Sequence, residues 1–258
     1  MYLKSVVQMA SLVLHFRNGL TLVERMRTAQ PCDEVVLWGG MRIAHPPERG
    51  GLLEALVELW VEHVYTAEFY RPSGGDVIVD AGANVGLFAI QMARQNRRCR
   101  VIALEPFPEN FKYLQANVAR ACPQNVTCCE VALGSGFSTG QMQAVGSRSL
   151  DHVLRIESGS ANGIPVIPLG GLFDLVRAQE IAFLKVDIEG SEYDVFAVAS
   201  SDVLGRFKRI AMEYHDQIVP GTLDLLRRVL SPTHEIIVRP SKMEGCGILL
   251  ARRRALQK

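Results

Sequence analysis

The chain has 258 residues, which fits one large domain with an extension or with a small second domain. Hydrophobic residues make up 48% of it and the formal net charge is +1, so a large core is expected, and neither nucleic acid nor an anionic membrane is indicated as a partner. No stretch reaches the roughly 20 apolar residues that a membrane-spanning helix needs. The six cysteines include no C-x-x-C pair, which argues against a zinc site and indicates reduced thiols in a cytoplasmic protein.

Residues 1–71 are expected to form an N-terminal cap of helices and one hairpin. Residues 1–30 carry apolar side chains at helical spacing. Residues 34–45 predict a hairpin, because the Gly-Gly pair in their middle tolerates positive φ. Residues 52–70 again have the apolar spacing of a helix. A Pro-Ser-Gly-Gly break then separates this cap from the main domain, residues 72–258.

The main domain alternates predicted strands and helices, which indicates an α/β, doubly wound (Rossmann-like) sheet that is mostly parallel. The last two strands have no room for a helix between them, so they are expected to form an antiparallel C-terminal hairpin. Residues 134–163 are expected to be a loop with a short hairpin. The predicted strands are 77–80, 100–106, 126–133, 181–190, 209–216, 234–240 and 245–253. The first predicted helix follows strand 77–80 and ends near residue 95, and the others span 108–121, 170–179, 192–200 and 222–231.

The sequence VIVDAGANVGLFAI, residues 77–90, is the most informative stretch of the chain. Its pattern predicts a buried strand that ends at Asp80, a tight turn with Gly82, Asn84 and Gly86, and the start of a helix. Glycine has no Cβ, so such a turn lets a nucleotide-like ligand approach the backbone closely. Neither the G-x-G-x-x-G motif of dinucleotide sites nor the Walker motif is present. A carboxylate here would repel a pyrophosphate but suits the ammonium and sulfonium of S-adenosylmethionine, which leaves an NAD site as the weaker alternative.

Acidic residues recur at the ends of four predicted strands. Besides Asp80, these are Glu105 at the end of the second strand, Asp187 at the end of the fourth, and Glu213 at the end of the fifth, where His215 follows. One such residue is explained by capping of a helix, but four together favour a binding site, because ligands of doubly wound sheets bind at the carboxyl ends of the strands. Glu105 follows Asp80 at an interval close to the ~20 residues at which a carboxylate binds ribose hydroxyls.

The segments 80–86, 103–111, 183–192 and 212–216, taken together and in this order, resemble the FkbM-type S-adenosylmethionine-dependent methyltransferases. The resemblance implies the class I methyltransferase fold and O-methylation of a hydroxyl on a small molecule, such as a sugar, a polyketide or another natural product. A non-catalytic, regulatory protein of the same fold that binds the cofactor remains the alternative. The family usually has Thr-Leu-Asp where this chain has IPLGGLFD (167–174), which puts substrate contacts of this loop in doubt. The similar segments are DAGANVG (80–86), ALEPFPENF (103–111), FLKVDIEGSE (183–192) and MEYHD (212–216), with ELWVEHVY (58–65) upstream.

The resemblance implies a cofactor site along the ends of the first four strands. The turn after the first strand would cradle the methionine moiety, and the segment after the second strand would bind the ribose and flank the adenine. The end of the third strand would line the adenine edge, and Asp187 would face the methyl donor. The implied cofactor-binding residues are Asp80, Gly82, Asn84, Gly86, Glu105, Pro106, Phe107, Glu130, Val131, Ala132 and Asp187.

The expected catalytic residues are His215, Asp187, Glu213 and Lys185. His215 is the preferred general base, because the ordinary histidine pKa of about 6.5 is close to working pH, and a structural histidine is the alternative. Lys185 lies inside an apolar strand, so it is expected to pair with a carboxylate such as Glu213. Asp187, Glu213 and His215 have the ligand types of a divalent metal site, but we expect no metal.

Trp60 and Tyr65 are expected to pack the cap onto the sheet, and a cap placed over the strand ends would shape the acceptor pocket. The expected cofactor is S-adenosylmethionine, and the expected partner is a small-molecule acceptor. We expect no nucleic-acid partner and no membrane insertion, while homo-oligomer formation stays open.

Overall fold

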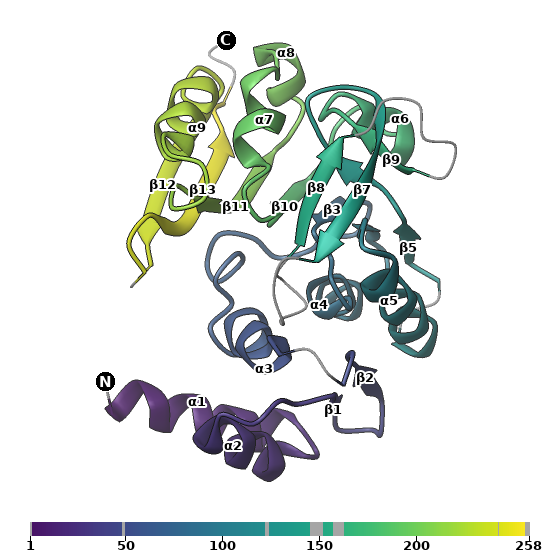
Figure 1. Ribbon diagram of the computed structural model, residues 1–258, viewed down its shortest axis with the longest axis vertical. Helices are drawn as coiled ribbons and strands as arrows, with labels where there is room; N and C mark the ends of the chain where they lie inside the picture. Colours follow the sequence, from purple (N-terminus) through teal and green to yellow (C-terminus); the bar gives the residue numbers. More distant parts are fainter. Residues whose placement is uncertain are drawn as a thin grey trace.

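The computed structural model describes residues 2–47, 50–121, 124–144, 152–156, 163–241 and 243–255. Its centre is a seven-stranded sheet with the order β12-β13-β11-β10-β3-β4-β5 (Figure 1). Five strands run parallel, while β13 is antiparallel to both β11 and β12, which confirms the predicted doubly wound sheet with its terminal hairpin. The strands are β3 (Val77–Ala81), β4 (Arg100–Leu104), β5 (Val126–Cys129), β10 (Phe183–Val186), β11 (Arg209–His215), β12 (His234–Pro240) and β13 (Cys246–Arg253).

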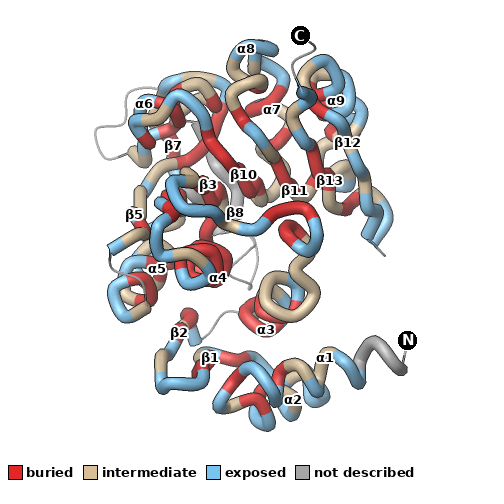
Figure 2. The backbone as a smooth tube through the Cα atoms, turned by 180° about the vertical axis from the view of Figure 1, so that it is seen from behind, coloured by how far each residue is buried: buried red, intermediate tan, exposed pale blue. Residues whose placement is uncertain are grey.

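Helices cover both faces of this sheet, so its middle strands are buried on both sides (Figure 2). Side chains of a strand alternate between the two faces. In β3, Ile78 belongs to the apolar cluster that includes the cap, and Val79 belongs to the cluster on the opposite face. The covering helices are α4 (Leu87–Gln95), α5 (Pro108–Ala121), α6 (Gly171–Val176), α7 (Glu192–Ala197), α8 (Ser201–Leu204) and α9 (Thr222–Leu230).

The same alternation places the candidate site on the cap side of the sheet. Asp80 follows Ile78 at a spacing of two, and Lys185 follows Phe183, a member of the cap-side cluster, in the same way. The register pairs Lys185 with Asp80 across β10 and β3. Glu213 lies two residues after Ala211, which is also in the cap-side cluster. The pleat of three neighbouring strands therefore directs these charged residues toward the cap.

The cap consists of α1 (Tyr2–His15), α2 (Gly19–Thr28), the hairpin β1 (Glu34–Val36) and β2 (Arg42–Ala44), α3 (Leu52–Leu56) and the wider π-helical turn η1 (Val57–Val61). The predicted helix over 52–70 is wrong beyond Val61. His63 and Ala67 have positive φ, and such residues turn the chain out of a right-handed helix. Among the described residues, no helix has the length and apolarity that a membrane crossing requires.

The predicted strand over 126–133 is also wrong as a single element. β5 ends at Cys129, and β6 (Ala132–Leu133) belongs to a second sheet of order β6-β9-β7-β8. In that sheet β7 (Ser138–Ala144) pairs antiparallel with β8 (His152–Ile156) and with β9 (Ile164–Ile167). The predicted short hairpin within 134–163 is confirmed, although residues 145–151 and 157–162 lie outside the described residues.

Polar and aromatic contacts fasten the cap to the main domain. The Asn117 side chain in α5 accepts a hydrogen bond from the Ala44 amide at 2.9 Å and donates to the Ala44 carbonyl at 2.8 Å and the Val85 carbonyl at 2.9 Å. Trp60 donates its indole N–H to the Leu87 carbonyl at 3.0 Å, which confirms its expected packing role. The cap hairpin, the glycine turn and α5 thus meet at one buried amide.

We predict that Asn117→Ala lowers the free energy of unfolding by roughly 2–3 kcal/mol, because it leaves buried backbone groups of Ala44 and Val85 without their hydrogen-bond partners. Urea unfolding followed by circular dichroism measures the change. Gln115→Ala is the control, since Gln115 is exposed on the same helix. Equal stability of the two variants would contradict the role of Asn117.

Candidate active site

The glycine turn after β3 packs directly against the end of β10. Gly82 has φ +78°, and a Cβ at this position would lie 1.8 Å from the Asp187 carbonyl oxygen. The amides of Gly82 and Ala83 donate to the Leu104 carbonyl at 3.1 and 2.9 Å, which ties the turn to the end of β4. Glycine is therefore required at position 82 by both its conformation and its close neighbour.

Glu105 holds the turn from the other side. Its carboxylate accepts hydrogen bonds from the amides of Asn84 at 2.7 Å and Phe107 at 2.9 Å. Burial raises the pKa of Glu105 to about 7, against the opposing effect of these two hydrogen bonds. Each carboxylate oxygen has two lone pairs, so Glu105 keeps capacity to accept hydrogen bonds from a ligand hydroxyl.

A buried ion cluster lies beneath the turn. The Lys185 ammonium is 3.3 Å from Asp80 Oδ1 and 3.4 Å from Asp187 Oδ2, and it donates a hydrogen bond to the Gly82 carbonyl at 2.8 Å. Lys185 does pair with carboxylates as predicted, but the sequence prediction of Glu213 as its partner is wrong, because the strand register places Asp80 beside it. Burial raises the pKa of Asp80 to about 6 although Lys185 opposes this shift.

Asp187 is the more accessible of the two carboxylates that Lys185 contacts. Asp80 is fully buried, whereas 18% of the Asp187 side chain is exposed. A cation that enters from the cavity beside the turn therefore meets Asp187 first, and Asp80 contributes through Lys185 from below.

Tyr65 of the cap connects the ends of β10 and β11. Its buried ring lies edge-on to Phe88, with centroids 6.3 Å apart. Its hydroxyl can donate to Asp187 Oδ2 at 3.2 Å or to Glu213 Oε2 at 3.4 Å. Burial, followed by the charges of Asp187 and Glu213, raises the pKa of Tyr65 well above its usual value, so the phenol keeps its proton. The sequence predicted a packing role for Tyr65 and missed this polar contact, because these residues are far apart in the chain.

Glu213 lies half-buried at the end of β11. Cys246 of β13 donates its thiol hydrogen to Glu213 Oε1 at 3.3 Å. Burial and then the charge of Asp187 raise the pKa of Glu213 above its ordinary value. A carboxylate with a raised pKa is a better proton acceptor near neutral pH than an exposed one.

His215 is buried between two carboxylates. Its Nδ1 lies 3.2 Å from Glu192 Oε1, and its Nε2 lies 3.6 Å from Glu189 Oε2. Burial lowers the pKa of His215, but the hydrogen bond to Glu192 and the nearby negative charges outweigh this effect and raise it to about 9. A protonated ring has no lone pair for a substrate proton. The geometry therefore favours the structural alternative for His215 over its predicted role as base.

Asp187, Glu213 and His215 bring ligand atoms within 4.8 Å of one another, as a metal site would require. Two features of the same residues oppose a metal. Lys185 already contacts Asp187 Oδ2, the oxygen that faces it, and a histidine must lose its proton before it can bind a metal. The absence of a resident metal stays a prediction.

The residues predicted to line the adenine lie along the same edge of the sheet. The Glu105 amide donates to the Cys129 carbonyl at 3.1 Å, which brings the end of β4 beside the end of β5. Ala132 is buried in β6, whereas the other four residues predicted to line the adenine are partly or fully exposed to solvent. Those four are Pro106, Phe107, Glu130 and Val131, of which Glu130 is the exposed one.

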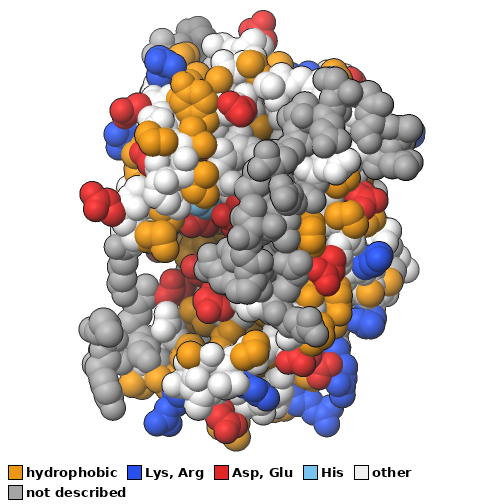
Figure 3. Space-filling model, viewed as in Figure 1, with side chains coloured by type: hydrophobic (Ala, Val, Ile, Leu, Met, Phe, Trp, Pro, Cys, Tyr) orange, Lys and Arg blue, Asp and Glu red, His pale blue; other side chains and the backbone are white. Residues whose placement is uncertain are grey.

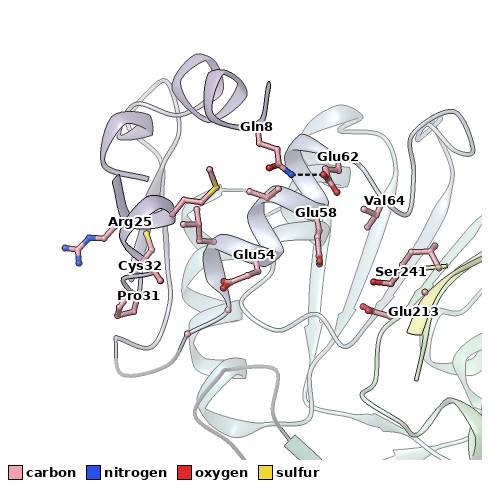
Figure 4. A pocket seen from close by; sticks show the side chains of 18 of the residues that line it. Gln8, Arg25, Pro31, Cys32, Glu54, Glu58, Glu62, Val64, Glu213 and Ser241 are labelled. Atoms are coloured by element: carbon pink, nitrogen blue, oxygen red, sulfur yellow. Dashed lines mark hydrogen bonds between the residues drawn. The ribbon is translucent and has the colours of Figure 1, made fainter. Parts of the chain in front are cut away.

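Asp187 and Glu213, whose ligand atoms lie within 4.8 Å of each other, line two different cavities. A small cavity of about 30 Å³ beside the glycine turn includes Lys185 and Asp187 in its lining. A groove of about 1200 Å³ between the cap and the C-terminal hairpin includes Glu213 (Figures 3 and 4). The Tyr65 hydroxyl contacts both carboxylates and thus links a residue that lines one cavity to a residue that lines the other.

The helical segment α3–η1 forms a wall of both cavities. Its residues Leu52, Ala55 and Leu59 line the cavity beside the turn. Its residues Glu54 and Glu58, on another face, line the groove.

Comparisons with known proteins identify the family. The model of the methyltransferase FkbM domain matches residues 80–234. The 31-O-demethyl-FK506 methyltransferase FkbM of Streptomyces tacrolimicus is 27% identical over 199 residues, which cover 64% of this chain and 75% of the relative. The AMB antimetabolite synthetase AmbE of Pseudomonas aeruginosa is 28% identical over 216 residues, which cover 66% of this chain but only 10% of AmbE.

The fold comparison agrees with this assignment. The METTL16 methyltransferase domain superposes with a TM-score of 0.50 at 13% identity, covering 92% of this chain and 78% of that structure. That solved structure is thus similar to this chain in fold, and the family match indicates the methyl-transfer reaction. The chain belongs to the FkbM methyltransferase family, with S-adenosylmethionine as its methyl donor.

Proposed function

We propose that this methyltransferase acts on a hydroxyl group of a small-molecule acceptor. The supporting observation is that Asp187, which lines one cavity, and Glu213, which lines the other, have ligand atoms within 4.8 Å of each other and both contact the Tyr65 hydroxyl. The small cavity belongs to the glycine turn, and the groove is large enough for a sizeable second substrate. The name of the Streptomyces relative describes O-methylation of a natural product, which is consistent with this proposal.

The residues around the turn fit the cofactor. Gly82 lets the turn pack against the Asp187 carbonyl, which keeps Asp187 beside the turn, and Glu105 retains acceptor capacity for ribose hydroxyls. Asp187 presents negative charge to the cavity, where a sulfonium or an ammonium would be stabilised. When bound, S-adenosylmethionine supplies a methyl group that its positively charged sulfur already activates.

In the proposed mechanism, Glu213 is the general base. Its carboxylate lines the groove and would accept the proton of the acceptor hydroxyl as that oxygen takes the methyl group, while the electron pair of the broken carbon–sulfur bond would remain on the sulfur of the S-adenosylhomocysteine released. Tyr65 keeps its proton and orients Asp187 and Glu213 through its hydroxyl. Lys185 holds Asp187 in place from below. Alignment of the acceptor oxygen with the methyl group then supplies much of the remaining rate enhancement.

We predict that Glu213→Gln lowers kcat by about 10²–10⁴-fold, because the amide cannot take the proton. In the unchanged protein, kcat should fall as pH drops through the raised pKa of Glu213, since protonation removes the base. The rate of S-adenosylhomocysteine release measures both effects. Glu235→Gln is the control, because Glu235 is exposed on β12. A Glu213→Gln rate equal to that of the control would refute the role of Glu213 as base.

We predict that Glu105→Gln weakens S-adenosylhomocysteine binding by about 10–100-fold, which corresponds to the loss of about 1.5–3 kcal/mol for hydrogen bonds to a charged group. Isothermal titration calorimetry measures the affinity, with Glu24→Gln at an exposed position of α2 as the control. Cofactor binding without turnover of any hydroxylated acceptor would support the regulatory alternative instead.

We predict that EDTA leaves the rate of methyl transfer unchanged. Lys185 already contacts Asp187, and the protonated His215 has no lone pair for a cation, so we expect no divalent cation there. A rate that EDTA abolishes and Mg²⁺ restores would overturn this prediction and assign a metal to Asp187, Glu213 and His215.

A further inference from the structure

The cavity beside the glycine turn, which suits the positively charged end of the cofactor, is lined partly by the cap. The turn, Lys185 and Asp187 belong to its lining, and so do five residues of the cap. The family model starts at residue 80, so this part of the lining lies outside the matched domain. The contacts that hold the cap against the turn therefore determine the shape of the cavity. The five cap residues are His45, Gly51, Leu52, Ala55 and Leu59.

Helix α5 packs directly against the glycine turn. Gly86 has φ +93°, and a Cβ at this position would lie 2.8 Å from the Cδ1 atom of Leu114 in α5. Asn117 follows Leu114 by three residues, so both side chains lie on the same side of the helix. The missing side chain at Gly86 thus lets α5 come close enough for Asn117 to reach the backbone of the turn.

The Asn117 amide binds the cap and the turn at the same time. It exchanges two hydrogen bonds with the backbone of Ala44 in the cap hairpin, and it donates a third to the Val85 carbonyl in the turn. Arg120 donates a further hydrogen bond to the Asn117 oxygen at 3.3 Å. Both N–H groups and both lone pairs of the amide are then used, and the Asn117 side chain is fully buried. Neither backbone segment can shift without breaking a buried hydrogen bond.

Both backbone segments that Asn117 binds continue into the cavity lining. On the side of the turn, Val85 and its neighbour Asn84 line the cavity. On the side of the cap, Ala44 is followed by His45, a buried residue that also lines the cavity. Asn117 itself is outside the lining, yet it fixes the position of one wall relative to the other.

The α3–η1 side of the cap is attached separately. Trp60 donates to the Leu87 carbonyl, and the Gln91 amide in α4 donates to the Leu59 carbonyl at 2.9 Å. These two hydrogen bonds hold η1 on α4, whereas Asn117 holds the hairpin on the turn. Loss of the Asn117 amide would therefore release the hairpin wall of the cavity and leave the bonds of the α3–η1 wall in place.

We propose that Asn117 is a positioning residue for the cofactor, which sets the affinity for S-adenosylmethionine by tying the cap hairpin to the glycine turn. The cap hairpin is then part of the cofactor site, although the family model does not include it. Docking of the hairpin and binding of the cofactor would stabilise each other, because such linkage is reciprocal. The proposal concerns the cofactor alone and does not depend on which acceptor is methylated.

The affinity for S-adenosylhomocysteine tests this proposal directly. We expect Asn117→Ala to raise Kd about tenfold, which corresponds to the loss of one or two net hydrogen bonds. Isothermal titration calorimetry with the full chain measures Kd at a temperature where circular dichroism shows the variant folded. The control is Asn125→Ala, which removes an amide that donates to the Ala93 carbonyl at 3.0 Å, at the opposite end of β5 from the site. The control should keep the Kd of the unchanged protein, and an equally small Kd for Asn117→Ala would overturn the proposal.

Hydrogen–deuterium exchange of the unchanged protein provides a second test, which does not depend on the stability of a variant. We expect S-adenosylhomocysteine to slow exchange in the hairpin 34–45 as well as in the turn 82–86, with no change in the edge strand 234–240. In folded Asn117→Ala, protection of the turn should remain and protection of the hairpin should be lost. Slower exchange in the turn of the unchanged protein without any change in the hairpin would contradict the proposed coupling. Neither test uses an acceptor, so failure to methylate a hydroxyl would count against the proposed function alone.

Discussion

The site depends on the contacts that the buried Lys185 ammonium makes. This ammonium lies between Asp80 and Asp187 and binds the Gly82 carbonyl, so one buried cation joins the end of β3, the glycine turn and the end of β10. Removing one partner of a buried ion pair leaves the other charge buried without compensation, and this lowers the stability of the fold far more than replacing the whole pair does. The conformation of the turn and the position of Asp187 therefore both follow from this one side chain.

Burial and charge pairing also explain why some acidic residues shape the turn and others face the ligands. Asp80 and Glu105 are buried, and the ion pair of Asp80 with Lys185 and the amide hydrogen bonds of Glu105 tie them to the turn, so they shape it. Asp187 and Glu213 are partly accessible and share the Tyr65 hydroxyl, so they face the ligands. Glu192 holds His215 and accepts the amides of Ile188 and Gly190, which fixes the loop after β10.

The sequence was sufficient to predict the doubly wound sheet, its terminal hairpin and the glycine turn, because periodicity and turn residues are local signals. It failed where pairing partners are distant in the chain. Nothing between 126 and 133 indicates that β6 leaves the main sheet for β9. The partners of Lys185 follow from strand register, and the pKa of His215 follows from Glu192 and Glu189, so neither could be read from residue type alone.

The position of α3–η1 between the two cavities makes it a partition. Its face with Leu52 and Leu59 bounds the cavity at the glycine turn, while Glu54 and Glu58 bound the groove. A rigid partition cannot shift to widen one compartment without narrowing or reshaping the other. A ligand in one compartment that moved α3–η1 would therefore reshape the other compartment, and any such linkage between two ligands is reciprocal.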